Sequence, residues 1–260
     1  MTISIFMGAP DYIRITTGRV LSLLIIATLL ASTAIPCDPE FYFLFRDEAR
    51  AKLESLQYDN SDYDTFEKAV LLHNIAFHKD KDARKAAEKL FKGLKDDDSL
   101  SNMILAYNGS LKMIKVSQSN TASKILKSLN PFGHSPRGEA RNGFKMITEA
   151  VENDPDKKVL RLLRATAAVE SAEYLNEMFD DAKSELTWLD SHITPDDSVM
   201  TFIVNLNWGK YYYRLWEKDK NSADIKLAAQ YIKTARKYAC TPVYAGWVAD
   251  WETKLVLGPE

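Results

Sequence analysis

Cysteine is nearly absent from the sequence, because the 260 residues contain only two, Cys37 and Cys240. Two cysteines cannot build the dense disulfide framework of a small secreted domain, and alone they cannot complete a zinc site. Glycine and proline are sparse as well, at 10 and 9 residues, and runs of alternating β-branched residues are few. Alanine, leucine and lysine are frequent instead, so the composition predicts an all-α fold.

A charge excess of either sign is also missing. The 34 Lys and Arg residues nearly balance the 36 Asp and Glu residues, and the formal net charge is -2. Because a nucleic-acid footprint needs a basic excess, we expect no nucleic-acid partner. Hydrophobic residues make up 46% of the chain and aromatic residues 11%. This is ample for a buried core and argues against a disordered chain.

The apolar run near the amino terminus is too short for an ordinary membrane span. Arg14 and Arg19 precede an uncharged stretch of 17 residues, Val20 to Pro36, whereas a membrane helix usually needs about 20 apolar residues. A basic flank, a short apolar core and small residues are typical of an export signal. We therefore expect residues 1–36 to be an export signal or, alternatively, a membrane anchor. Residues 37–260 would form one domain in a bacterial periplasm or anchored at the cell envelope.

Cys37 directly follows the apolar stretch, where a bacterial lipoprotein carries its acylated cysteine, and is therefore a candidate lipid attachment site. The residue before it, Pro36, departs from the small residue that this motif normally has. The alternative is cleavage after Ala34, which would leave Cys37 as a thiol that could form a disulfide with Cys240. The simplest interpretation of Cys240 itself is a small buried residue at a helix end.

Beyond Cys37, apolar residues recur at helical spacing in one segment after another. Breaks as short as Asp154-Pro155 force consecutive helices to lie antiparallel. An irregular insertion at about residues 117–138 is rich in helix-stopping residues and longer than the usual loop between packed helices. The expected helices are 40–57, 63–78, 83–94, a fourth that is capped by residues 96–99 and ends near residue 116, and then 139–153, 156–175, 177–192, 196–218, 223–239 and 243–257.

The break at Asp154-Pro155 carries a recognisable pattern. In the 34-residue tetratricopeptide repeat, a small residue is followed after four residues by a large apolar one, after seven by a second small one, and after twelve by proline. All four positions match in the first of the following sets, and the other two match in part. The sets are Gly143, Ile147, Ala150 and Pro155; Ala228, Ile232 and Ala235; and Trp208-Gly209 with Tyr212.

The chain thus resembles a degenerate tetratricopeptide-repeat protein and is similar to exported bacterial proteins of this type. The resemblance implies three to four antiparallel hairpins between Tyr63 and the carboxyl terminus, stacked as a right-handed α-solenoid with a surface for partners. Spacing departs from 34 residues in most units. The insertion at 117–138 also separates the helix at 139–153 from its partner, which puts continuous stacking in question at this point.

Known catalytic and metal-binding patterns are missing. His73 and His78 are five residues apart, not the four that place two ligands on one helix face, and no Gly-rich phosphate loop occurs. Glu170, Glu173 and Glu177 share a helix face and are typical of a solvated surface. We therefore expect no enzymatic activity, no metal site and no cofactor.

Aromatic residues repeat at helical steps in the last third of the chain, with Trp208, Tyr212 and Trp216 four residues apart. Most are expected in the core. The alternative is a ring-lined pocket closed by two arginines of an otherwise apolar helix, although these arginines could simply pair with Glu149 or Glu152 of the preceding helix. The candidate partner- or ligand-binding residues are Arg161, Arg164, Trp208, Tyr212 and Trp247.

These features lead to two functional hypotheses. The first is an exported, non-enzymatic helical-repeat scaffold that binds a protein or peptide partner at the cell envelope. The second is a periplasmic component that binds an apolar small molecule and is associated with a solute transporter. A closed void of roughly 300 Å³ or more among the aromatic rings would favour the second hypothesis, and an open groove would favour the first.

Overall fold

The computed structural model describes residues 40–57, 61–94, 99–118, 135–173, 175–194 and 196–257. All of them belong to a compact unit that spans Cys37–Glu260. The predicted export signal at 1–36, the candidate lipid site Cys37, the caps at 96–98 and most of the insertion at 117–138 lie outside the described residues.

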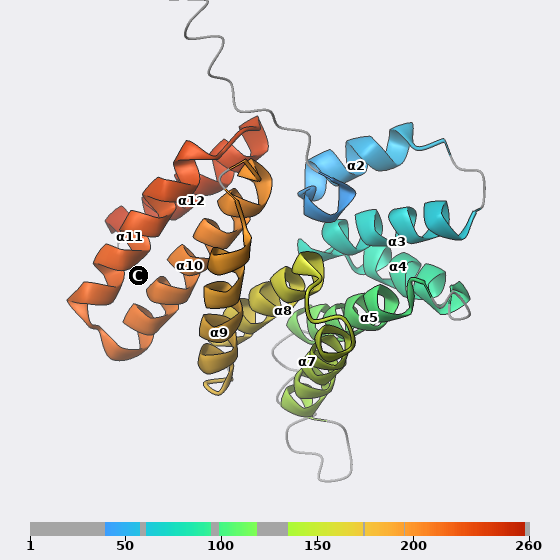
Figure 1. Cartoon of the computed structure of the whole chain (residues 1–260), viewed down its shortest axis with the longest axis horizontal. Helices are drawn as coiled ribbons and strands as arrows, with labels where there is room; N and C mark the ends of the chain where they lie inside the picture. The colour runs from blue at the N-terminus through green and yellow to red at the C-terminus, as the bar shows by residue number, and fades with distance from the viewer. Residues whose placement is uncertain are drawn as a thin grey trace, which may run out of the picture. The chain divides into compact units, whose positions relative to one another are not determined.

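The described residues form helices and no strand, so the predicted all-α class is confirmed (Figure 1). A single 3-10 turn precedes ten α-helices. In chain order these elements are η1 (Phe41–Phe43), α2 (Arg46–Ser55), α3 (Asp62–Phe77), α4 (Lys81–Gly93), α5 (Ser101–Ser117), α7 (Pro136–Asn153), α8 (Lys158–Ser171), α9 (Met178–His192), α10 (Ser198–Asp219), α11 (Ser222–Lys237) and α12 (Pro242–Leu257).

Side-chain caps fix where several helices begin. Asp80 Oδ1 accepts hydrogen bonds from the backbone N–H groups of Asp82 and Ala83 at 3.1 and 3.0 Å. Helix α4 therefore begins at Lys81, two residues before the predicted start at residue 83. Helix α7 begins at Pro136, three residues before the predicted start. The reason is that Ser135 caps it and proline suits the first helical position, so residues that indicated a loop here open a helix instead.

The predicted helix at 40–57 is wrong in its first turns. After the 3-10 turn, Leu44 and Phe45 are extended, and α-helix begins only at Arg46. We call residues 41–45 the aromatic strap. Asn74 Nδ2 donates a hydrogen bond to the Phe41 carbonyl (3.1 Å), and the Tyr244 hydroxyl donates one to the Phe43 carbonyl (3.1 Å). These bonds take carbonyl groups that an α-helix would have used for itself.

The rings of the aromatic strap pack against helices that are far apart in the sequence. Phe41 meets Phe66 of α3 edge to face, with ring centroids 6.3 Å apart. Phe45 meets Tyr244 of α12 in the same way, at 5.0 Å. Tertiary packing of the rings in different directions therefore overrides the helical spacing of these residues.

The most extensive helix contacts join α3 with α4, α5 with α7, α8 with α9 and α10 with α11. The first helices of successive pairs also touch, in the order α3, α5, α8 and α10, and each second helix touches the next first helix, as α7 touches α8. Figure 1 shows this succession from α3 to α12. Each pair thus covers the apolar side of its neighbours, which a two-helix hairpin cannot bury alone.

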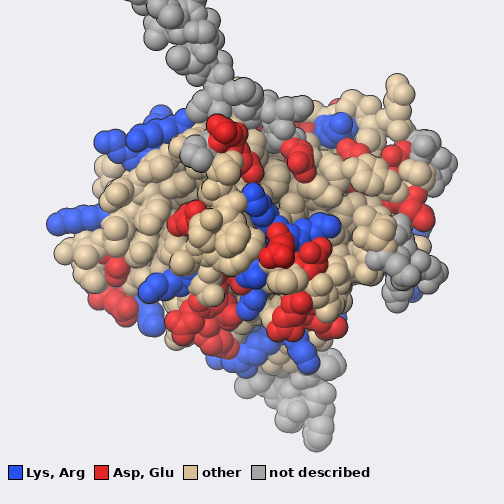
Figure 2. Space-filling model, viewed as in Figure 1, with Lys and Arg blue, Asp and Glu red and all other residues tan. Residues whose placement is uncertain are grey.

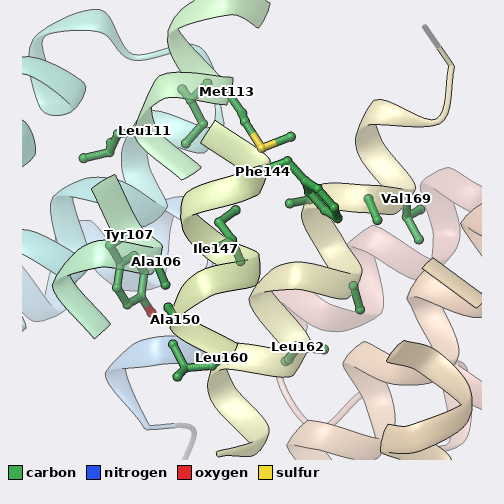
Figure 3. Close-up of a cluster of buried hydrophobic side chains, with 14 of the residues drawn as sticks. Ala106, Tyr107, Leu111, Met113, Phe144, Ile147, Ala150, Leu160, Leu162 and Val169 are labelled. Atoms are coloured by element: carbon green, nitrogen blue, oxygen red, sulfur yellow. The ribbon is translucent and has the colours of Figure 1, made fainter. Parts of the chain in front are cut away.

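Helices α5 and α7 pack with their backbones in contact, although the 117–138 insertion separates them in the sequence. A Cβ atom on Gly143 would lie 2.5 Å from the carbonyl oxygen of Gly109, and a Cβ atom on Gly109 would collide with the carbonyl oxygen of Gly143. Buried side chains on both sides, including Tyr107 and Ile147, fill the neighbouring space (Figure 3). The insertion therefore does not break this helix pair.

The contact between Gly109 and Gly143 predicts that Gly143→Ala lowers the free energy of unfolding by about 1–3 kcal/mol, because the new methyl group has to push two backbones apart. Urea unfolding followed by circular dichroism would measure this. The matched control is Gly246→Ala in α12, where a Cβ atom meets nothing within 4 Å. There the helix propensity of alanine should raise stability by up to about 1 kcal/mol. Equal stability of Gly143→Ala and wild type would contradict the close packing.

Candidate functional site

An open cleft with a volume of about 690 Å³ is walled by α2, the end of α3, α8, α10 and α12. We call it the basic cleft, because its lining has more cationic than anionic side chains. On the face shown in Figure 2, by contrast, Lys and Arg are interspersed with Asp and Glu. The charged lining residues of the cleft are Arg46, Lys79, Lys210, Arg214 and Lys254, with Glu170 and Asp250 as the acidic ones.

The innermost charge of the cleft is Lys210, which is buried. Its Nζ lies 2.7 Å from Oε1 of Glu170 on α8. Burial by itself would raise the pKa of Glu170, but the charge and hydrogen bond of Lys210, with the charges of Arg214 and Lys254, outweigh it and lower this pKa. Glu170 is therefore ionised at neutral pH.

Arg214 lies one turn after Lys210 on α10 and binds two further carboxylates. Its guanidinium nitrogens are 2.9 Å from Glu173 and 2.7 Å from Glu217. Burial would lower the pKa of Arg214, but the hydrogen bond to Glu217 and the surrounding carboxylates raise it. The prediction that Glu170, Glu173 and Glu177 share a helix face is wrong, because α8 ends at Ser171. All three carboxylates are paired, since Glu177 also binds Arg141 at 2.6 Å.

Two tryptophan rings also line the cleft, next to the lysines. Lys254 Nζ lies 4.5 Å from the centroid of Trp251, and Lys210 Nζ lies 5.4 Å from that of Trp247. Trp247 stacks on Phe45 of the aromatic strap, with centroids 5.0 Å apart. Cations beside aromatic faces leave a surface that can accept both an anionic group and an apolar one.

A second, smaller cavity of about 130 Å³ adjoins the cleft, and we call it the apolar chamber. Phe77 and His78, at the end of α3, line both cavities. The remaining walls are residues 42–45 of the aromatic strap, with His73, Asn74, Tyr107, Val159, Leu162, Leu163, Thr166 and Ile203.

His73 is buried in the chamber wall, with Nε2 at 2.8 Å from the Ser110 hydroxyl and Nδ1 at 3.1 Å from Asn74 Oδ1. Burial lowers the pKa of His73 to about 4, against which its hydrogen bond to Asn74 acts weakly. A histidine beside a serine hydroxyl is the geometry of a nucleophile and its base, but Ser110 lines neither cavity. The contact fixes α3 to α5.

The two histidines considered as ligands both line the apolar chamber, and His78 also lines the basic cleft. Burial first, and then the charges of Arg46 and Lys210, lower the pKa of His78. Within the described ranges, His, Cys, Asp and Glu side chains form no group of three that could hold a metal ion.

Arg161 and Arg164 point to α9 and pair with neither Glu149 nor Glu152. Both bind Glu185, at 3.1 and 3.0 Å, and Arg164 also binds Asp181 at 2.9 Å. The side chain of Glu185 is only 3% exposed. The prediction that these arginines form ion pairs is confirmed, but the predicted partners on α7 are wrong. The reason is that α8 packs more extensively on α9 than on α7.

Of the three aromatic candidates, only Trp247 lines the cleft. The Trp208 ring stacks on Tyr212 and Tyr231, with centroids 5.6 and 5.5 Å apart, and its Nε1 donates a hydrogen bond to Asp190 at 2.8 Å. Trp208 and Tyr212 of α10 therefore belong to the packing between α10 and α11. Sequence reasoning missed Lys210 and Arg214, whose signal was two cations one turn apart on a largely apolar helix.

Cys240 lies in the half-buried connection between α11 and α12 and is disulfide-bonded. The predicted position near a helix end is confirmed, but the predicted burial is only partial. The other cysteine of the chain, Cys37, is outside the described residues. None of the helices in the described part of the chain is long and apolar enough to cross a membrane.

Comparison with known proteins gives no relative: no family model, no curated protein and no solved structure matches this chain.

The buried His73 predicts a pH-dependent stability. The pKa of about 4 in the folded state lies below the ordinary value near 6.5, so the unfolded chain binds a proton more readily between these values. The stabilisation that the fold gains from a neutral His73 is fully present above pH 6.5 and is lost as the pH falls towards 4. It amounts to about 3 kcal/mol at 1.36 kcal/mol per pKa unit. Urea unfolding between pH 4 and pH 7 would measure it.

In His73→Gln, the part of the pH slope due to this group should disappear, whatever the stability at pH 7. The control is His192→Gln on the exposed end of α9, which should keep the wild-type slope. An unchanged slope in His73→Gln would show that other groups cause it.

Proposed function

We propose that this chain is an exported, non-enzymatic helical-repeat protein that binds a protein or peptide partner at the cell envelope, and that its hairpins form a tetratricopeptide-like, right-handed α-solenoid. The solenoid is supported by the order of the helix contacts, in which each pair covers the next. It is also supported by the tight contacts at Gly143 and Gly209, two positions that match the repeat pattern.

The observation that carries partner binding is the basic cleft. Its volume is about 690 Å³. It is open, and it combines exposed cations with tryptophan faces. A peptide can lay alternating side chains into such a surface, and the excess of basic lining residues favours acidic sequences.

Export is supported by the disulfide at Cys240, because disulfides persist in oxidising compartments such as the bacterial periplasm. The chain has one other cysteine, so an intramolecular disulfide would use the sulfur that lipidation of Cys37 needs. We therefore propose export with removal of the amino-terminal segment and with Cys37 unacylated.

Intact mass spectrometry of the protein extracted from its native cell envelope tests this proposal. The expected mass lacks the amino-terminal signal, carries no acyl chain, and rises by two hydrogen atoms on reduction. An acyl chain on Cys37 would refute the disulfide assignment, and a full-length mass would show that the segment is retained.

Partner binding is tested by panning a random peptide library on the immobilised full-length chain. We expect enriched acidic peptides with dissociation constants of roughly micromolar order. Trp247→Ala should weaken their binding by about tenfold or more, since aromatic anchors dominate such contacts. The matched control is Trp188→Ala, which removes a partly buried tryptophan of α9 outside the cleft. Failure to enrich any peptide, or equal binding by both variants, would count against the cleft.

A second candidate function is the binding of a small molecule, and one observation favours it. The apolar chamber adjoins the basic cleft and shares two wall residues with it. A purely peptide-binding groove would not need such a chamber.

A further inference from the structure

We propose that the apolar chamber and the basic cleft together bind a small amphipathic organic acid, with a phenyl-sized apolar group in the chamber and the carboxylate in the cleft. This inference rests on the second candidate function, small-molecule binding. Peptide binding at the cleft could stand without it.

The chamber has the size and the chemistry for one apolar group. Its volume is about 130 Å³, and an apolar protein cavity of about 150 Å³ is known to bind benzene. Val159, Leu162 and Leu163 of α8 form one wall, and residues 42–45 of the aromatic strap form another. Such a cavity is too small for a folded peptide segment but accepts a ring or a short alkyl chain.

Three polar side chains of the chamber wall already have partners within the protein. His73 contacts Ser110 and Asn74, Asn74 Nδ2 donates to the Phe41 carbonyl, and Thr166 Oγ1 accepts a hydrogen bond from Asn207 at 2.9 Å. A polar ligand group placed here would lose its hydration without gaining a strong partner. The chamber therefore selects for apolar groups.

The cleft has the opposite preference. Lys210 and Arg214 are each paired with carboxylates. Arg46, Lys79 and Lys254 are exposed and form no salt bridge with another described residue. The Lys254 ammonium lies 4.5 Å from the centroid of Trp251, and such a low-dielectric wall strengthens the attraction for an anion. An incoming carboxylate thus meets cations that are not yet neutralised.

Phe77 and His78 connect the apolar chamber to the basic cleft, because both residues line both cavities. A ligand whose ring occupies the chamber would pass these two residues before its carboxylate reaches the lysines. Because the pKa of His78 is lowered, its ring is neutral at pH 7, and one ring nitrogen carries a hydrogen that can be donated to the carboxylate.

Isothermal titration of the full-length chain at pH 7 with three probes tests the inference. Phenylpropanoate has both groups, propanoate lacks the ring, and phenylpropanol lacks the charge. We expect phenylpropanoate to bind at least about tenfold more tightly than either of the others. Equal affinity for phenylpropanoate and phenylpropanol, or no measurable binding of phenylpropanoate, would overturn the proposal.

Three variants assign the binding to the two cavities. Lys79→Glu and Lys254→Glu, both at exposed positions of the cleft, should weaken phenylpropanoate about tenfold and leave phenylpropanol unchanged. Val159→Phe should fill the chamber and abolish the binding of both. The matched control is Lys226→Glu on the exposed face of α11, which should change neither. Unaltered phenylpropanoate binding in both cleft variants would place it elsewhere, even if Val159→Phe does not fold.

Peptides enriched by the panning experiment separate the two proposals. If phenylpropanoate fails to bind while Trp247→Ala still weakens the peptides, only the chamber inference falls. If the peptides fail and phenylpropanoate binds as expected, partner binding is the part that is wrong.

Discussion

The aromatic strap is the contact on which the rest of the site depends. Its rings and carbonyl groups join α3 to α12, two helices from opposite ends of the described chain, through Phe41 on one side and Phe45 on the other. Residues of the strap also line the apolar chamber. Arg46, the residue that follows the strap, lines the basic cleft. Without this segment both cavities would lose one side, although each helix pair would keep its own packing.

The packing of α5 against α7 fixes the position of α8, which lines the same two cavities as the strap and Arg46. Gly109 and Gly143 bring these backbones into contact, and α8 packs against both helices. Helix α8 then presents its apolar residues to the chamber and Glu170 to Lys210 in the cleft. A single close approach, made by two residues without side chains, thus sets the position of a helix that serves both cavities.

The local part of this architecture could be predicted from the sequence, and the distant part could not. The helix that Asp80 caps is predicted to within two residues of its start, and the small-residue position at Gly143 is read correctly from its spacing. The strap was predicted as helix because Phe41, Leu44 and Phe45 have helical spacing, whereas their conformation is decided by Tyr244 and Phe66. Spacing along the chain does not show which helices will meet. It therefore cannot predict the partner of Gly109, the carboxylate that binds Arg161, or the cleft.

The hydrogen bond from Tyr244 to Phe43 spans 201 positions of the sequence. A chain that is synthesised or exported amino terminus first therefore carries the Phe43 carbonyl without this partner until the last helix arrives. Contacts of such long range form late in folding, because the intervening chain has to be ordered first. Any molecule that binds only the finished cavities would favour completion of the fold.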